Sequence, residues 1–422
     1  MKNFHQDPVS FLANLEKKSP VAKFRLGPMR CYYISSLSGI EQVLKQRENY
    51  IKGGPIYAIG KKIIKGSLVE IDEERWKSRN KTLSPMFFRK KIESYFNDIC
   101  ACFEQETGKI FHQQTVDISS MSFHYTLKTL SHTVFGTAFT EKDSKEILEN
   151  IQLLVVTVEK IISKGFFLPL WIPSKQNREL NASLMKFRSI VKNIIRHKVK
   201  KNSFIYDLTQ AFYMDKKVYM NEQELVSEIL LFFMAGIETT ALTLSWTLHH
   251  LCTNNEIKKK FHDELDEVVG QEPLTLAKLH QLDYMEKIIN ESMRYSPAFW
   301  LISRYIPKKQ MLDGHRIKAK SIILFSPYML HHNKKYWKNS QEFIPERFAK
   351  KLTPNQKKAY IPFGNGPRIC IGKHFAMMEI KIALAQLGKR FDFKLQEGIK
   401  VEKCFSSALV PKHNIHIEIK NR

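Results

Sequence analysis

The run Phe363-Gly364-Asn365-Gly366-Pro367-Arg368-Ile369-Cys370-Ile371-Gly372 is the most informative part of this chain. It reads F-G-x-G-x-R-x-C-x-G, a pattern with six specified positions that chance rarely produces. The cysteine comes just before an apolar helical pattern, and a thiol at a helix N-terminus is expected to have a lowered pKa. Glycines at 364 and 366 permit a tight turn. The alternative is a buried structural cysteine in a glycine-rich turn.

This loop resembles the signature of the cytochrome P-450 family, and the resemblance implies a haem b cofactor. Cys370 would be the metal ligand, because an axial thiolate pushes electron density onto the iron. Arg368 is expected to pair with a haem propionate, and Phe363 to screen the sulfur from water. Gly364 and Gly372 belong to the same cofactor-binding loop.

Periodicity indicates a mainly α protein with small β-sheets, an α+β class. Helical spacing dominates residues 70–254, with one helix expected from about Ala182 and the longest over 222–252. Strand-like runs lie at 24–27, 31–34, 302–306 and 322–325, and a last helix is expected over 373–389. The resemblance implies a triangular, helix-rich single domain over 1–422, with haem between the long central helix and the cysteine-loop helix. We expect no fused reductase.

The amino-acid composition limits the classes of binding partner that we expect. The 422 residues include 67 basic and 42 acidic ones, a net charge of +25. The basic residues are scattered, which disfavours nucleic acid and leaves an acidic protein or an anionic membrane surface as alternatives. Six cysteines without a CxxC pair indicate a reducing compartment. The N-terminus has no apolar run and the centre of the longest helix is too short to cross a bilayer, so we expect a cytoplasmic protein without a transmembrane segment.

Two further motifs predict a structural charge network. Glu291 and Arg294 form an E-x-x-R pair on one helix face, and Arg347 lies in a P-E-R-F segment. Alone, such a pair is usually a solvated surface contact. In the family these positions form a buried network that holds the core around the haem loop.

The segment Ala235-Gly236-Ile237-Glu238-Thr239-Thr240 resembles the family's oxygen-binding groove. A glycine inside a helix costs about 1 kcal/mol relative to alanine, which suggests a helix that opens locally. The resemblance implies that Thr239 hydrogen-bonds bound oxygen and that Glu238 relays protons from solvent. Without the cysteine loop, an ordinary helical threonine beside a surface glutamate would be the better interpretation.

Two residues outside the loop are expected to bind the propionates. Trp76 matches the first position of the family's W-x-x-x-R motif, but Asn80 stands where the arginine is expected. Arg79, Lys81 or Asn80 itself remain alternatives for that role. Arg304 resembles the family's other propionate-binding arginine, the alternative being a charge at a strand edge.

The predicted function is a monooxygenase that inserts one atom of O2 into a lipophilic substrate, by hydroxylation or epoxidation. Electrons would come from NAD(P)H through a separate ferredoxin or flavodoxin and its reductase. Candidate docking residues are Lys357, Lys358, Lys373 and the cluster at 75–81, unless these are simply solvated charges. A peroxide-dependent peroxygenase is an alternative that the acid–threonine pair disfavours. A non-catalytic haem sensor is a weaker one.

The substrate is the least defined part. The resemblance places the following mostly apolar residues in the substrate pocket: Phe233, Met234, Ala235, Phe299, Trp300, Leu301, Ala408 and Leu409. The motifs, with Trp171-Ile172-Pro173, are most similar to those of fatty-acid, terpenoid and carotenoid hydroxylases. A carrier-tethered biosynthetic intermediate stays open.

Overall fold

The computed structural model describes residues 4, 6–54, 57–108, 115–134, 145–147, 149–150, 153–154, 172–197, 203–214 and 220–422. Its longer helices are α2 (Pro8–Lys18), α3 (Leu37–Lys45), α5 (Glu73–Leu83), α7 (Phe96–Thr107), α8 (Ile118–Thr133), α10 (Lys175–His197), α11 (Phe204–Met214), α12 (Glu222–Thr253), α13 (Asn255–Val268), α15 (Asp283–Tyr295) and α18 (Lys373–Arg390). Short helical segments are α4 (Ala58–Ile63), η2 (Ser84–Phe87), α6 (Arg89–Glu93), α14 (Leu276–Gln281), α16 (Pro327–His331), η4 (Pro345–Phe348), α17 (Pro354–Ala359) and η5 (Gly366–Arg368).

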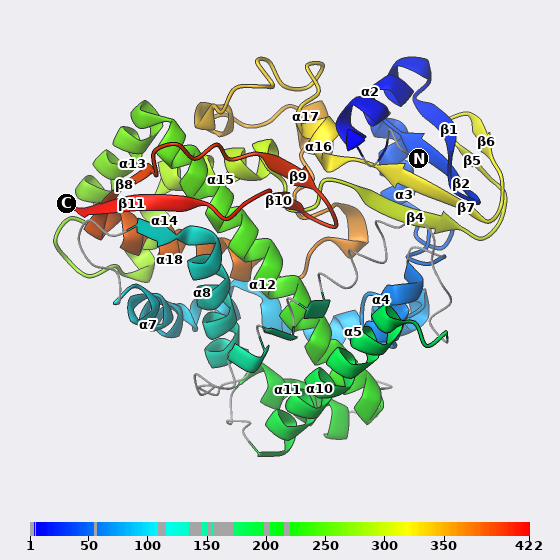
Figure 1. The fold of residues 1–422 in the computed structure, drawn as a ribbon, viewed down its shortest axis with the longest axis horizontal. Coiled ribbons are helices and arrows are strands. Elements are labelled where there is room, and N and C mark those ends of the chain that lie inside the picture. The colour runs from blue at the N-terminus through cyan, green and yellow to red at the C-terminus, as the bar shows by residue number, and fades with distance from the viewer. Residues whose placement is uncertain are drawn as a thin grey trace.

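The strands form small separate sheets. They are β1 (Val21–Leu26), β2 (Met29–Ile34), β3 (Thr115–Asp117), β4 (Ile302–Ile306), β5 (Gln310–Leu312), β6 (His315–Ile317), β7 (Ser321–Phe325), β8 (Phe391–Leu395), β9 (Lys403–Phe405), β10 (Leu409–Pro411) and β11 (His416–Asn421). The largest sheet has the order β1-β2-β7-β4, with β2 and β7 parallel and the other pairs antiparallel. It lies at one end of the molecule, and β3-β11-β8 lies at the other (Figure 1).

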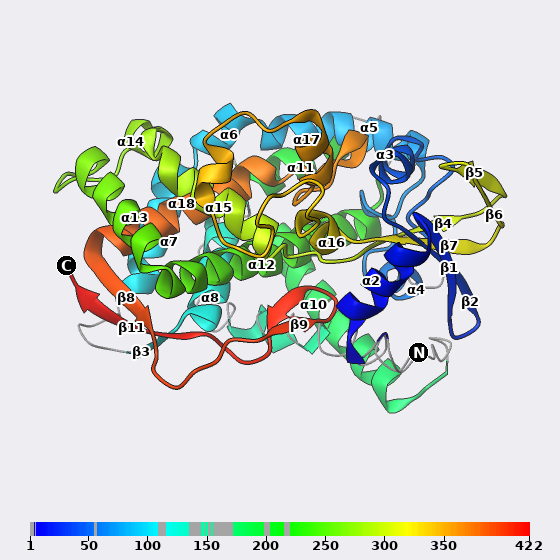
Figure 2. The same ribbon diagram turned by 90° about the horizontal axis from the view of Figure 1, so that it is seen from above.

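Helix α12 runs through the middle of the molecule (Figure 2). Its N-terminus has a capping box in which Asn221 and Glu224 satisfy each other's backbone amides. The helix is long and apolar enough to cross a membrane, but 72% of its most apolar window is buried by the surrounding protein. Helix α12 is therefore a core helix, in which a continuous apolar surface packs against neighbouring helices.

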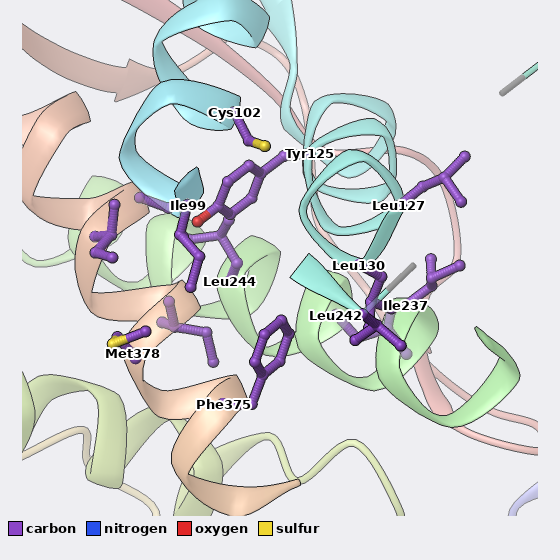
Figure 3. Packing of buried hydrophobic residues seen from close by; sticks show 14 of the residues in the cluster. Ile99, Cys102, Tyr125, Leu127, Leu130, Ile237, Leu242, Leu244, Phe375 and Met378 are labelled. Carbon is purple, nitrogen blue, oxygen red and sulfur yellow. The ribbon is translucent and has the colours of Figure 1, made fainter. Parts of the chain in front are cut away.

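The largest hydrophobic core joins α7, α8, α12 and α18 (Figure 3). Tyr125 of α8 is fully buried there, and its hydroxyl donates to the carbonyl of Glu379 in α18 at 2.9 Å. Phe375 and Met378 reach into the same core from α18. The helix that follows the cysteine loop is thereby fixed against α8 and α12, which limits how far the loop can shift.

The expected α+β class is confirmed, and several expected elements match closely. The strand-like runs correspond to β1, β2, β4 and β7, and the two longest expected helices to α12 and α18. Helix α10 begins at Lys175 rather than near Ala182, because Ser174 caps it by accepting from the amide of Asn177 at 3.2 Å. Trp171 of the expected W-I-P pattern lies outside the described residues.

Candidate functional site

The cysteine loop is held in one shape by its glycines. Gly364 and Gly366 have φ angles of 74° and 75°, a conformation that other residues rarely adopt. A Cβ on Gly366 would lie 3.0 Å from the carbonyl oxygen of Leu44 in α3. The amide of Cys370 donates to the carbonyl of Phe363 at 2.9 Å and closes the loop. This backbone presents Cys370 just before the first turn of α18.

Cys370 differs from the other five cysteines, which are buried or half-buried, because the residue as a whole is exposed to solvent. Even so, the protein packed around the thiol raises its pKa by burial, and the N–H of Gly372 with the charges of Lys52 and Lys373 offset this only in part. The helix N-terminus alone therefore does not give the lowered pKa that we expected. A metal ion bonded to the sulfur would supply the missing positive charge and deprotonate the thiol.

Two arginines stack on Trp76 of α5. The guanidinium carbons of Arg368 and Arg47 lie 4.2 and 4.5 Å from the centre of its buried ring. Both arginines also pair with Glu73, at 3.4 and 2.8 Å. Arg368 further donates to the carbonyl of Leu68 at 3.0 Å. The expected partners Trp76 and Arg368 are therefore in direct contact.

Lys52 and Arg304 add two more positive charges beside Arg368, and we refer to Arg47, Lys52, Arg304 and Arg368 as the cation cluster. Burial, reinforced by Arg304 and Arg368, lowers the pKa of Lys52 to about 7. Nη1 of Arg47 is buried without a hydrogen-bond partner. Sequence reasoning missed Arg47 and Lys52, because neither belongs to a motif.

The cation cluster fits an acidic ligand. Among the described residues, its ion pairs are all with Glu73, so positive charge is in clear excess. Desolvated cations of like sign repel one another unless an anion pairs with them. The propionate groups of haem are such anions, and an exposed cysteine for its iron lies in the same loop as Arg368. The residues present therefore fit a haem.

Arg79 does not take the place of the missing arginine at position 80. It is fully buried, and its guanidinium pairs with Glu224 at 3.1 Å and with Glu228 at 3.3 Å, both in α12. Burial raises the pKa of Glu228 to about 7, although Arg79 lowers it in part. Helix α5 is thus tied to α12 through Arg79, while Asn80 is half-buried and Lys81 is exposed to solvent.

The expected oxygen-binding segment is a regular part of α12. The hydroxyl of Thr239 donates to the carbonyl of Ala235 at 2.6 Å, and Ala235 is exposed within an otherwise largely buried helix. A Cβ on Gly236 would lie 2.8 Å from Cδ1 of Leu130 in α8. The glycine therefore allows α8 to pack closely and does not mark a break in the helix. Glu238 is half-buried.

The structure brings Glu291, Arg294 and Arg347 together. Arg294 is fully buried and pairs with both carboxylate oxygens of Glu291 at 2.7 Å, and Arg347 approaches the same carboxylate at 3.3 Å. Arg294 also donates to the carbonyl of His331, whose Nε2 accepts from the amide of Ile361 at 3.0 Å. This connects the network to the start of the cysteine loop through His331, a link that no sequence motif indicated.

The residues expected in the substrate pocket do not share one environment. Ala235 and Phe299 are exposed, the latter by 50%, and Met234 and Leu301 are half-buried. Phe233 is fully buried against Phe187, and Ala408 and Leu409 are also buried. Trp300 packs against Phe405 and donates to the carbonyl of Ser406 at 2.7 Å. The contacts of Phe233 and Trp300 are therefore those of core residues.

The sequence model of the cytochrome P450 family matches residues 1–419. The chain belongs to this family. It is 26% identical over 396 residues to the cyclooctat-9-en-7-ol 5-monooxygenase of Streptomyces melanosporofaciens, covering 93% of this chain and 86% of that protein. Cyclooctatin synthase of the same organism is 27% identical, with 93% and 87% covered. Human cytochrome P450 3A5 is 27% identical, with 85% and 76% covered.

As a cytochrome P450, this protein is an oxidoreductase that incorporates oxygen from O2 into a lipophilic substrate. The family implies a haem-thiolate cofactor and a supply of electrons from redox partners. The peroxygenase and sensor alternatives are not favoured, since the chain belongs to the cytochrome P450 family and a similar protein is named a monooxygenase. The helix-rich architecture with small sheets agrees with the cytochrome P450 fold.

Proposed function

We propose that Cys370 is the thiolate ligand of a haem b that binds between α12 and the cysteine loop, in a single haem domain spanning 1–422. The observation that carries this proposal is the exposed Cys370 beside the cation cluster. When bound, the haem supplies the oxygen chemistry, and the protein supplies binding, orientation and proton delivery. Phe363 and the glycines of the loop fix the direction of the sulfur.

Five residues are proposed to hold the propionate groups. Trp76, Arg304 and Arg368 follow from the family pattern, and Arg47 and Lys52 are additions of this chain that compensate for Asn80. Arginine donors form strong charge-assisted hydrogen bonds to carboxylates. The unpartnered Nη1 of Arg47 supports its assignment, because a buried donor without an acceptor is costly.

Thr239 and Glu238 are proposed to handle protons. The Thr239 hydroxyl donates to the carbonyl of Ala235 in the structure. Rotation about the Thr239 side chain would redirect the same proton toward an oxygen atom on the side of α12 where substrate is proposed to bind. Half-buried Glu238 is the neighbouring acid that would resupply the proton from solvent.

The charge network of Glu291, Arg294 and Arg347 is proposed to be structural. It connects α15 and η4, and through His331 it fixes Ile361 at the entry of the cysteine loop. Burial lowers the pKa of His331 to about 3, so this histidine is neutral and its Nε2 can accept a hydrogen bond. Its role is to keep the loop in place rather than to take part in chemistry.

The substrate is proposed to be an apolar molecule of the terpenoid or fatty-acid class that contacts Ala235 and Phe299. The names of two similar proteins, a cyclooctat-9-en-7-ol 5-monooxygenase and a cyclooctatin synthase, support the terpenoid class. The apolar character of the exposed residues supports a lipophilic ligand of either kind.

A separate ferredoxin or flavodoxin, in the cytoplasm, is proposed as the electron donor. Lys77, Lys81, Lys357 and Lys373 are exposed and can attract an acidic partner, whereas Lys358, although exposed, already pairs with Glu41 at 2.7 Å. Arg75 and Arg79 drop out of the expected docking set, because both pair with glutamates of α12. Turnover that does not slow at rising salt would contradict electrostatic docking.

Product analysis tests the proposed function. The purified holoprotein would be supplied with ferredoxin, its reductase, NADPH and isotopically labelled O2, and incubated with a panel of diterpene alcohols, fatty acids and steroids. We expect a product that carries one labelled oxygen atom, preceded by a shift of the haem to high spin on substrate binding. Substrate-independent NADPH consumption with no labelled product from any class would contradict the proposal.

A further inference from the structure

A basic cavity lies between α4, α10 and the first turns of α12. Its volume is about 1050 Å³, comparable with that of a small-molecule site. Unlike most such sites, its walls carry many charges. The basic residues that line it are Lys61, Lys62, Lys65, Lys186, Arg188 and Lys192.

The two carboxylates that line this cavity are already engaged. Glu224 receives Arg75 at 2.7 Å and Arg79 at 3.1 Å. Glu146 pairs with Lys186 at 3.2 Å. Of the basic wall residues, Lys186 is this partner of Glu146, and Lys61 and Lys192 pair with Glu70 at 3.3 Å and Glu222 at 3.8 Å. Glu224 is held by arginines outside the wall, so the positive charge left for an incoming anion lies mainly on Arg188 and Lys65.

Arg188 is the fixed centre of the basic wall. Its Nη2 donates to the carbonyls of Lys62 and Ile63 at 2.9 and 3.4 Å, which holds the half-buried guanidinium at the end of α4. In the part of the chain that the structure describes, neither Arg188 nor the exposed Lys65 has a carboxylate partner. A guanidinium held by one edge leaves its other donors available in a defined direction.

The cavity lies at the far end of the helix face that carries the proposed oxygen site. Glu224 lines the cavity, and Ala235 is eleven residues further along α12. Eleven residues are about three helical turns, so the two positions share a face and are separated by about 16 Å along the axis. That is a distance which an extended alkyl or isoprenoid chain can span.

We propose that this cavity binds the anionic head group, a carboxylate or a phosphate, of a lipophilic substrate whose chain extends along α12 toward Ala235. This rests on the proposed function and adds a charged anchor to it. Arg188 and Lys65 bind the head group, which fixes how far along the chain oxidation takes place.

Spectral titration of the haem-loaded protein tests the anchor. Hexadecanoate, hexadecyl phosphate and neutral hexadecanol, which have the same chain, are compared by the shift of the haem to high spin. We expect at least one anion to bind about tenfold more tightly than the alcohol, the effect of a single charged hydrogen bond. The anion that shows the preference identifies the head group as carboxylate or phosphate.

Two variants and one control assign that preference to the cavity. Arg188→Gln and Lys65→Gln should each reduce it severalfold, while Lys259→Gln, an equal loss of charge on exposed α13, should leave it unchanged. Equal binding of alcohol and anions, or an anion preference that survives both cavity variants, would overturn the proposal. A normal carbon monoxide spectrum in every sample separates this failure from failure of the haem assignment.

Discussion

The cysteine loop and helix α5 both contribute to the proposed haem site, but the family motif predicts the structure of the loop better than that of α5. In the loop, two motif positions have a local structural reason, the positive φ angles of Gly364 and Gly366. In α5, Trp76 is where the family pattern places it, but the arginine stands one residue early. Arg79 pairs with Glu228 of α12, while Arg47 stacks on Trp76 and Lys52 lies beside Arg304 and Arg368.

The difference shows which kinds of site a sequence can specify alone. A loop that presents one sulfur depends on consecutive residues, so its pattern is contiguous. A positively charged site depends only on the positions of its charged groups in the folded protein, and residues from distant segments of the chain can supply those groups. Four predictions follow this comparison from its largest expected effect to its smallest.

Support of the cysteine loop by the buried network should give the largest effect. Arg294→Leu leaves Glu291 buried without its bidentate partner, which should lower the free energy of unfolding by about 3–5 kcal/mol. Denaturant unfolding of the purified protein measures this. Arg316→Leu, at an exposed position of β6, is the control and should change stability by less than about 0.5 kcal/mol. Equal losses of stability in the two variants would contradict a stabilising role of the network.

The pH dependence of stability tests the tie between α5 and α12. Glu228 has a folded pKa of about 7, above its ordinary value of 4.5, so the folded state binds more protons between these values. Stability should therefore fall as pH rises from about 4.5 to about 7, by roughly 3 kcal/mol at most. Glu228→Gln should flatten this segment of the curve. Parallel curves of stability against pH for the variant and the wild type would contradict the assignment of this pH dependence to Glu228.

Haem retention tests whether Arg47 and Lys52 replace the missing arginine. The double variant Arg47→Gln, Lys52→Gln should lose haem to apomyoglobin about tenfold faster, because charged hydrogen bonds to the propionates are lost. Lys77→Gln is the matched control, since Lys77 is exposed and lies 4.0 Å from the same Glu73. An unchanged rate of haem loss in the double variant would mean that Arg47 and Lys52 do not bind the propionates.

Restoring the family's arginine should have the smallest effect. If Arg47 and Lys52 already satisfy the propionates, Asn80→Arg should change the rate of haem loss by less than about twofold. The same transfer assay measures it. A large gain in haem retention would mean that Arg47 and Lys52 do not compensate for Asn80.

Sequence reasoning succeeded where a pattern acts over a few residues. The strands around Gly27, the long helix α12 and the cysteine loop all have local signals. It could not find Arg47, Lys52 or the link through His331, because their partners are distant in sequence. It also misjudged Gly236, whose reason is the approach of Leu130 from another helix. The burial that raises the pKa of Cys370 is likewise a tertiary effect.

The carbon monoxide spectrum of the reduced protein tests the central claim, that Cys370 ligates the haem iron as a thiolate. The wild type should show the strongly red-shifted Soret band of a thiolate-ligated haem. Cys370→His should lose that shift while it remains folded by circular dichroism. An unshifted band in the wild type, or a shifted band that persists in the variant, would contradict the claim.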